Sequence, residues 1–194
     1  DTYSVVAEEG DVYVNAGADG KHPGTHDLVA VGNVGLINKD YGRDPNHNVE
    51  PTNIALAFTT PNSSLTGAVL NEYAESNKNS HNSGADIYLQ NGATWNNEWI
   101  GMERPTPKKE RPSGDNAAYL YKGSKVRNLV GGVNPTAAGN IHPIDARPIT
   151  IQNYSGYVNA IYKSGMPACD TGKGQIIVEH AADNSHITMK GDHS

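Results

Sequence analysis

The sequence predicts an all-β fold of the solenoid type, a parallel β-helix in which short strands stack as repeated rungs. The first observation is composition. Charged residues make up only 19% of the 194 residues, while Gly and Pro number 21 and 11. Val, Ile, Thr and Tyr recur throughout, so the chain has the residues of strands and turns rather than those of a disordered segment. The second observation is a spacing that repeats along the chain.

Apolar positions carry this repeat. Equivalent positions are found at Leu56, Leu89, Leu120, Ile151 and Val178, so the successive offsets in the numbering are 33, 31, 31 and 27. A second apolar residue follows six positions later in three of the units, at Trp95, Val126 and Tyr157. Each unit therefore has the pattern of a strand, a tight corner and a second strand. Such a unit buries its apolar face only when neighbouring units stack on it.

The repeat suggests one continuous domain with an irregular beginning. Residues 54–194 are predicted to form the β-helix rungs, and residues 1–53 an N-terminal cap or irregular rungs. The segments Asp11–Asn15 and Leu28–Ile37 alternate like strands but do not share the period, and the sequence alone does not fix their register. The stretches between strand pairs are long and polar, so we expect them to project as loops, where binding residues commonly lie.

An antiparallel β-sandwich is the alternative fold. Asn91-Gly92 stands between alternating residues, which is a strong signal for a β-hairpin. The equivalent corners, Lys122-Gly123 and Tyr154-Ser155-Gly156, are not hairpin dipeptides of one kind. A set of hairpins also gives no reason for the regular spacing of the apolar positions, so the pattern favours the β-helix.

Two segments carry a family resemblance. Residues 85–99 read Ala-Asp-Ile-Tyr-Leu-Gln-Asn-Gly-Ala-Thr-Trp-Asn-Asn-Glu-Trp, and residues 64–67 read Ser-Leu-Thr-Gly. They resemble rungs of autotransporter passenger domains, the type V secreted proteins of Gram-negative bacteria. The resemblance covers roughly residues 54–191. It implies a right-handed β-helix that is exported and displayed outside the outer membrane.

The resemblance also implies a function in cell adhesion, biofilm formation or virulence, with a host or bacterial surface protein or glycan, or a second copy, as partner. A translocator β-barrel is expected downstream in the full-length protein. The chain itself lacks a signal peptide and this barrel, and it begins with Asp-Thr, so we expect it to be a passenger fragment. Its loops are long for the family.

Motifs of enzymes are missing from the sequence. It has no Gly-Asp-Ser-Gly or Gly-x-Ser-x-Gly nucleophile loop. A polysaccharide lyase, which is the enzymatic alternative, would need an Asp cluster for Ca²⁺, whereas Asp183 is isolated. We therefore expect neither catalysis nor a cofactor. A structural spacer stalk is a further alternative.

Charge is distributed unevenly. Residues 1–101 hold four basic and thirteen acidic residues, and residues 102–194 hold eleven basic and eight acidic ones, which gives −9 and +3 and the total of −6. This total argues against a nucleic-acid partner. Four basic residues crowd a Pro-rich loop, which could meet an acidic partner or glycan or could simply be solvated: Arg104, Lys108, Lys109 and Arg111.

The remaining candidates are aromatic, His and Cys side chains. Trp95 is expected to fill the core, whereas Trp99 is expected to be peripheral and able to stack on a sugar. The loop with His22 and His26 has residue types that bind metals, with Asp27 and His47 near, but solvated loop histidines explain it as well. Whether Cys169 has a function is left open, since nothing in its sequence context would lower its pKa.

Overall fold

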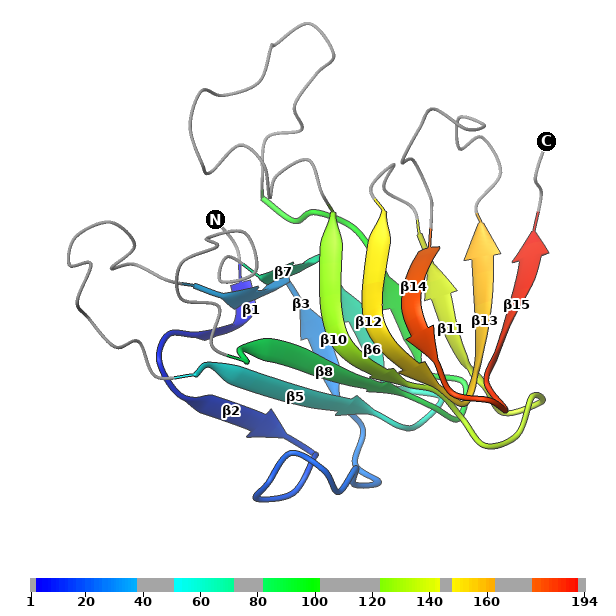
Figure 1. The fold of residues 1–194 in the computed structure, drawn as a ribbon, viewed down its shortest axis with the longest axis horizontal. Coiled ribbons are helices and arrows are strands. Elements are labelled where there is room, and N and C mark those ends of the chain that lie inside the picture. The colour runs from blue at the N-terminus through cyan, green and yellow to red at the C-terminus, as the bar shows by residue number, and fades with distance from the viewer. Residues whose placement is uncertain are drawn as a thin grey trace, which may run out of the picture.

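The chain forms three β-sheets in which every pair of named strands is parallel (Figure 1). The computed structural model describes residues 3–37, 51–71, 82–101, 123–143, 148–162 and 176–191. All elements assigned within these ranges are strands, so the all-β class is confirmed and the antiparallel sandwich is wrong. None of the described segments forms a helix of the length and apolarity needed to cross a membrane.

The three sheets are named A, B and C, and consecutive strands of the chain pass from one sheet to another. Sheet A has the order β1-β4-β7, with strands Tyr3–Ala7, Asn33–Leu36 and Val69–Asn71. Sheet B has the order β14-β12-β10-β8-β5-β2, with strands Ile176–Ala181, Ile149–Ser155, Ser124–Val130, Gly84–Leu89, Asn53–Phe58 and Asp11–Val14. Sheet C has the order β15-β13-β11-β9-β6-β3, with strands His186–Gly191, Tyr157–Tyr162, Gly139–His142, Thr94–Asn96, Ser64–Thr66 and Val29–Val31.

The pairing register explains the repeat and corrects part of it. Leu56 lies opposite Ile87 rather than Leu89, and Leu89 lies opposite Phe58. The last step of the repeat, from Ile151 to Val178, is confirmed, because these two residues lie opposite each other. Because alternate residues face the same side of a strand, apolar alternation alone leaves the register open by steps of two positions.

The third unit was placed wrongly. Val126 lies opposite Ile151 in sheet B, so it does not share the position of Trp95 in sheet C. Trp95 lies instead between Leu65 and Ile141. The reason is that β10 begins only at Ser124 and its apolar residues belong to the first strand of the unit. Leu120, the expected first apolar position of that unit, lies outside the described residues.

Strands of residues 3–37 enter the same three sheets. Val12 of β2 lies opposite Ile54, and Ala30 of β3 lies opposite Leu65. Paired residues of β2 and β5 are 42 positions apart, as are those of β8 and β10, whereas those of β5 and β8 are 31 positions apart. Steps of unequal length hide the first strands from a search for one fixed period.

Asn91 and Gly92 show why the hairpin signal misleads. Both residues have positive φ, 56° and 85°, as the favoured hairpin turns require. The turn connects β8 of sheet B to β9 of sheet C, which are not paired with each other. The side chain of Asn91 donates to the carbonyl of Thr59 one rung earlier, at 3.0 Å, so the corner is fixed to its neighbour in the stack.

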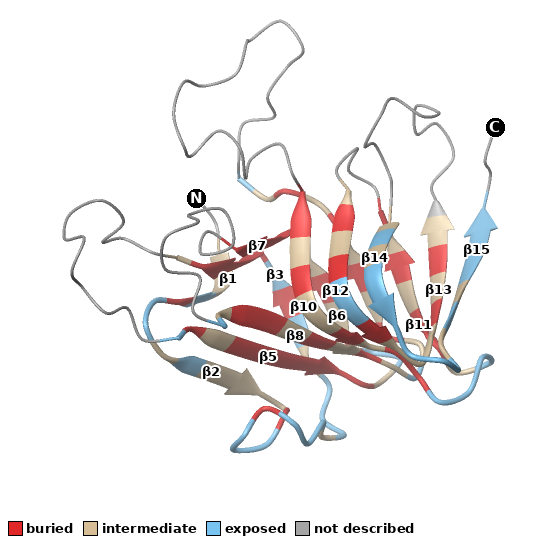
Figure 2. Ribbon diagram, viewed as in Figure 1, coloured by how far each residue is buried: buried red, intermediate tan, exposed pale blue. Residues whose placement is uncertain are grey.

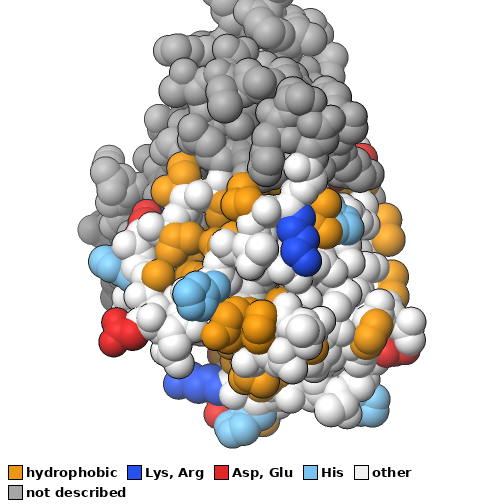
Figure 3. Space-filling model, turned by 90° about the vertical axis from the view of Figure 1, so that its right-hand side faces the viewer, with side chains coloured by type: hydrophobic (Ala, Val, Ile, Leu, Met, Phe, Trp, Pro, Cys, Tyr) orange, Lys and Arg blue, Asp and Glu red, His pale blue; other side chains and the backbone are white. Residues whose placement is uncertain are grey.

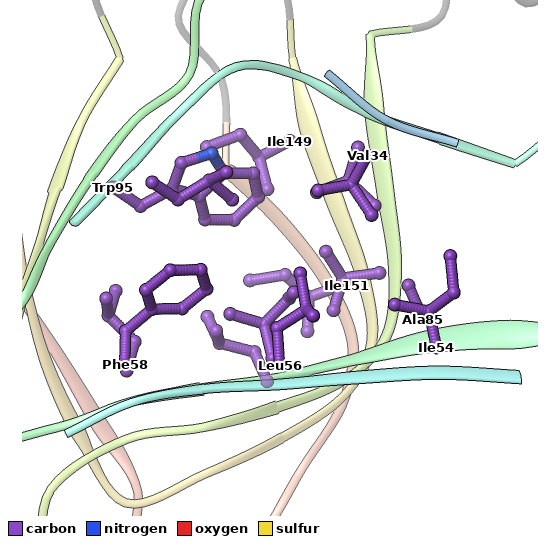
Figure 4. Packing of buried hydrophobic residues seen from close by; sticks show 14 of the residues in the cluster. Val34, Ile54, Leu56, Phe58, Ala85, Trp95, Ile149 and Ile151 are labelled. Carbon is purple, nitrogen blue, oxygen red and sulfur yellow. The ribbon is translucent and has the colours of Figure 1, made fainter. Parts of the chain in front are cut away.

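The core lies between the sheets, where inward residues form columns along the stack (Figures 2 and 4). Trp95 is fully buried, as expected, and points from sheet C toward the side chains of sheet B, where Phe58 and Leu56 lie. Its indole Nε1 donates to the carbonyl of Gly67 at 2.9 Å. The strands β14 and β15 are the most exposed ones, and hydrophobic and His side chains gather on the side of the molecule that they form (Figure 3).

Strands β10 and β12 of sheet B bend along their length, and β10 pairs with β8 only over its second half, from Asn128 to Val130 (Figure 1). The amide of Val69 in β7 donates to Ser124 Oγ at 3.0 Å, which holds the start of β10 beside sheet A. Val126 and Leu129 are both buried although they are three positions apart, and so are Ile151 and Tyr154. In a straight strand such residues would face opposite sides. Two successive polar residues therefore lie outside at each bend.

Tyr154 gives the buried bend a measurable pH dependence. Its ring is 4% exposed, its hydroxyl contacts the carbonyls of His186 and Gly156, and burial raises the pKa of the phenol. Because the unfolded phenol ionises near pH 10 while the folded one resists, stability is intact below pH 10 and falls as the pH rises above it. We expect urea unfolding to show this alkaline fall, and Tyr154→Phe to make it shallower while costing about 1 kcal/mol at pH 7. As a control, Leu129→Ala should lower stability equally at all pH values, and identical alkaline slopes for Tyr154→Phe and the native chain would contradict the assignment.

Candidate functional site

The outer face of the sheet B bend carries two adjoining hollows of about 430 and 400 Å³, a size suited to small ligands. Both are lined by Asn128 of β10 and Asn153 of β12. They follow β10, β12 and β14, the long strands right of centre in Figure 1. We call the two hollows together the sheet B groove, with the lining residues Lys125, Gln152 and Glu179 in one hollow and Lys21, Tyr88 and His180 in the other.

The floor of the groove is a row of polar side chains, two amides and one imidazole, held in register. Asn128 lies opposite Asn153, which lies opposite His180 in β14. Gln152 and Asn153 are exposed, and a strand spacing of about 4.8 Å separates one side chain of the row from the next. An amide presents two N–H donors and one acceptor oxygen. The row therefore presents two amides and one imidazole along one direction, and Asn128 Nδ2 already donates to Asp86 at 2.7 Å.

Arg127 lines the first hollow beside this row and forms an ion pair with Asp86. Its Nε and Nη2 donate to the two carboxylate oxygens of Asp86 at 2.9 and 2.8 Å. Its Nη1 donates to Asn53 Oδ1 at 2.8 Å and to the carbonyl of Asn82 at 2.7 Å. The hydrogen bonds to Asp86 raise the pKa of Arg127, so the guanidinium stays charged. One side chain thus connects β10 to the two preceding strands, β8 and β5.

Gly84 is what allows Arg127 to take this path. A methyl group added at Gly84 would lie 2.7 Å from both Cβ and Cδ of Arg127. Asp86 also accepts a hydrogen bond from Asn128 Nδ2 at 2.7 Å. The carboxylate therefore accepts hydrogen bonds from three donor groups of the protein.

Lys21 and Lys125 are the cations of the groove that are available to a ligand. Within the described residues, neither ammonium group takes part in an ion pair, whereas Arg127 is paired with Asp86. Glu179 is exposed and is likewise outside the ion pairs of the described ranges. The first hollow thus combines Lys125 with Glu179, and the second hollow contains Lys21.

The loop that carries Lys21 is fixed firmly against sheet B. Tyr88 donates from its hydroxyl to the carbonyl of Gly20 at 2.9 Å, and Thr59 Oγ1 donates to the carbonyl of Gly24 at 2.6 Å. Gly20 has φ +73°, and an added Cβ would lie 2.9 Å from the ring of Tyr13. Burial raises the pKa of Tyr88, so its hydroxyl remains a donor at neutral pH. Lys21 therefore projects from a rigid base.

Of the binding residues expected from the sequence, the described part of the chain includes Trp99, which does not line the groove. Arg104, Lys108, Lys109 and Arg111 lie outside the described residues, so binding by that loop stays a prediction. The peripheral position expected for Trp99 is wrong, because the residue is 7% exposed. Its ring packs with Ala68 and Leu70. An apolar patch on the outer face of sheet A, which the sequence period does not reveal, takes up this side chain.

The metal site considered for the loop with His22 and His26 is not supported by a cluster of ligands among the described residues. In the ranges that the structure describes, no three His, Cys, Asp or Glu side chains stand close enough to hold a metal ion. His22 Nδ1 lies 2.8 Å from Asp19 Oδ1, and this hydrogen bond lowers the pKa of Asp19. His26 is connected to Asn15 through its backbone. His47 and Cys169 are outside the described residues.

The groove could have been predicted from a sequence pattern that the search for apolar spacing overlooks. Polar pairs follow an apolar residue at the bend, and they recur at equivalent positions of three strands, as Arg127-Asn128, Gln152-Asn153 and Glu179-His180. In β10 and β12 the pair separates two buried residues. Such a doublet interrupts strict alternation, and its recurrence predicts a polar outer row.

Comparison of the chain with protein-family models, with curated proteins and with solved structures found no match.

Arg127→Lys tests the clasp on Asp86. Lysine cannot donate from a planar fork to both carboxylate oxygens, and it cannot reach Asn53 and Asp86 in the same way. We expect a loss of about 2–3 kcal/mol in the free energy of unfolding, measured in urea. Asp86→Asn should cost a similar amount, and the double variant much less than the sum, because both remove one network. Strictly additive losses would contradict a shared clasp.

Proposed function

We propose that this chain is a segment of a right-handed parallel β-helix that acts as a cell-surface adhesin and binds extended glycans along the sheet B groove. The observation that carries the glycan proposal is the in-register row of Asn128, Asn153 and His180 with exposed Gln152 beside it. Sugars present several hydroxyl groups per unit, and amides can both donate to and accept from them.

The β-helix proposal is supported by the pairing. Strands that are neighbours in one sheet are separated by strands of the other sheets, so the chain returns to each sheet after a long connection. Connections between parallel strands of one sheet are right-handed in about 98% of cases, which favours the right-handed winding. A stack of this kind presents its outer rows as long, nearly flat surfaces.

Adhesion fits a ligand that is long and repetitive. Each hydrogen bond to an exposed amide contributes little by itself, but successive units of a glycan meet successive strands of the same row, and their contributions accumulate. Display outside a bacterial outer membrane, and anchoring through a translocator barrel, rest on the resemblance of residues 64–67 and 85–99 to autotransporter passengers. The loop with Arg104, Lys108, Lys109 and Arg111 is proposed as a second contact for an acidic partner.

A glycan array probed with the full chain tests the proposal. We expect binding to a subset of oligosaccharides. The double variant Gln152→Ala and Asn153→Ala should lower the affinity about tenfold or more, since two or more hydrogen bonds of about 0.5–1.5 kcal/mol each are lost. The matched control is Asn140→Ala and Asn159→Ala, which removes amides from the outer face of sheet C, where Asn140 lies opposite Asn159.

The outcomes separate the candidate functions. Binding that the sheet B variant weakens and the sheet C control leaves intact supports the proposal. If the array retains none of its glycans, the proposal is overturned, and a structural spacer or the binding of a protein partner remains as the function. Release of shortened sugars with unsaturated ends would replace adhesion by lyase activity, and aggregation without any glycan would point to self-association.

A further inference from the structure

We infer that the sheet B groove selects polyanionic glycans and that Lys21 and Lys125 bind their acidic groups. This inference rests on the proposed glycan binding and names the class of ligand. Carboxylate and sulfate groups share the chemistry that a lysine ammonium recognises. The support comes from the charges that stay available in the groove after its internal pairs have been accounted for.

The pairing of Arg127 with Asp86 leaves a basic groove in an acidic protein. These two charges satisfy each other in a bidentate contact with side chains that are 24% and 19% exposed. Among the described Lys, Arg, Asp and Glu side chains that line the hollows, Lys21, Lys125 and Glu179 remain, which gives a balance of +1. The whole chain has a net charge of −6. Attraction of an acidic glycan therefore cannot come from overall charge and must be local.

The two lysines belong to different hollows that share a wall. Lys125 lines the first hollow and Lys21 the second, while Asn128 and Asn153 line both. A linear glycan that crosses the shared amides therefore passes one ammonium group before them and one after them. A ligand with an acidic group on successive units fits this arrangement, because its hydroxyls meet the amides and its charges meet the lysines.

Glu179 sets a limit on affinity and so provides a test of sign. Its exposed carboxylate lines the same hollow as Lys125. This carboxylate repels the acidic groups of a ligand. With a neutral glycan it interacts only by accepting hydrogen bonds from hydroxyl groups. Removing this charge should therefore strengthen binding of an acidic glycan, whereas removing the charge of a lysine should weaken it.

Titration calorimetry with matched oligosaccharides tests the inference. The probes are oligogalacturonate, its methyl ester as the neutral counterpart, and dextran sulfate as the sulfated one. We expect the acid to bind at least about fivefold more tightly than the ester, with an affinity that falls as salt is added. Lys21→Gln and Lys125→Gln should each weaken binding of the acid about threefold, and Glu179→Gln should strengthen it about twofold. The control is Lys190→Gln on β15, which lies outside both hollows.

Binding of either anionic probe with these changes supports the inference, and the preference between carboxylate and sulfate identifies the group. Equal affinity for acid and ester, unchanged by the variants, would overturn the inference while the proposed glycan binding stands. If Lys21→Gln and Lys125→Gln leave the affinity for the acidic probe unchanged, the inference is also overturned, and the ligand binds to another surface. If none of the probes binds and the glycan array is empty as well, both proposals fail. Circular dichroism of each variant confirms that the fold is intact.

Discussion

A strand of this chain buries its apolar side chains only when the strands before and after it in the stack extend the core between the sheets. The remainder of the structure depends on this constraint. Successive rungs each contribute a buried residue to a column of the core. One such column in sheet C consists of Leu65, Trp95 and Ile141. Stability therefore depends on nearest-neighbour contacts between rungs. The polar groups that remain inside are satisfied across rungs too, as the indole of Trp95 is by the carbonyl of Gly67.

The same constraint separates the two tasks of a strand. Inward residues preserve the columns, and outward residues are free to carry polar groups in rows. At the bend of sheet B the buried pair Val126 and Leu129 encloses two outward residues instead of one. The groove thus arises from a change in strand direction and needs no inserted domain. Gly84 and Arg127 then fix the position of the bend by close packing and by hydrogen bonds to Asp86.

The sequence reveals the fold class more fully than the site. The all-β class and the buried position of Trp95 follow from apolar alternation and turn residues. The spacing between rungs does not follow from one interval, since paired residues of sheet B lie 25 to 42 positions apart. The register of the third unit does not follow either, because alternation cannot separate Val126 from a residue of the second strand when a long connection precedes it. The burial of Trp99 depends on an apolar patch at Ala68 and Leu70 that only the folded chain assembles. The groove depends on residues from Lys21 to Glu179, whose proximity comes from the winding itself.

The polar doublets of the bend have a consequence for how such a surface can diverge. In an ordinary strand every second residue is committed to packing, so a new outward pattern is confined to isolated positions. Gln152-Asn153 and Glu179-His180 are adjacent and both outward, and they recur on neighbouring strands, so a compact block of side chains can be exchanged while the columns beneath stay unchanged. Homologous chains with one scaffold are thereby able to acquire different ligand preferences through substitutions alone, without insertions that would shift the register of the stack.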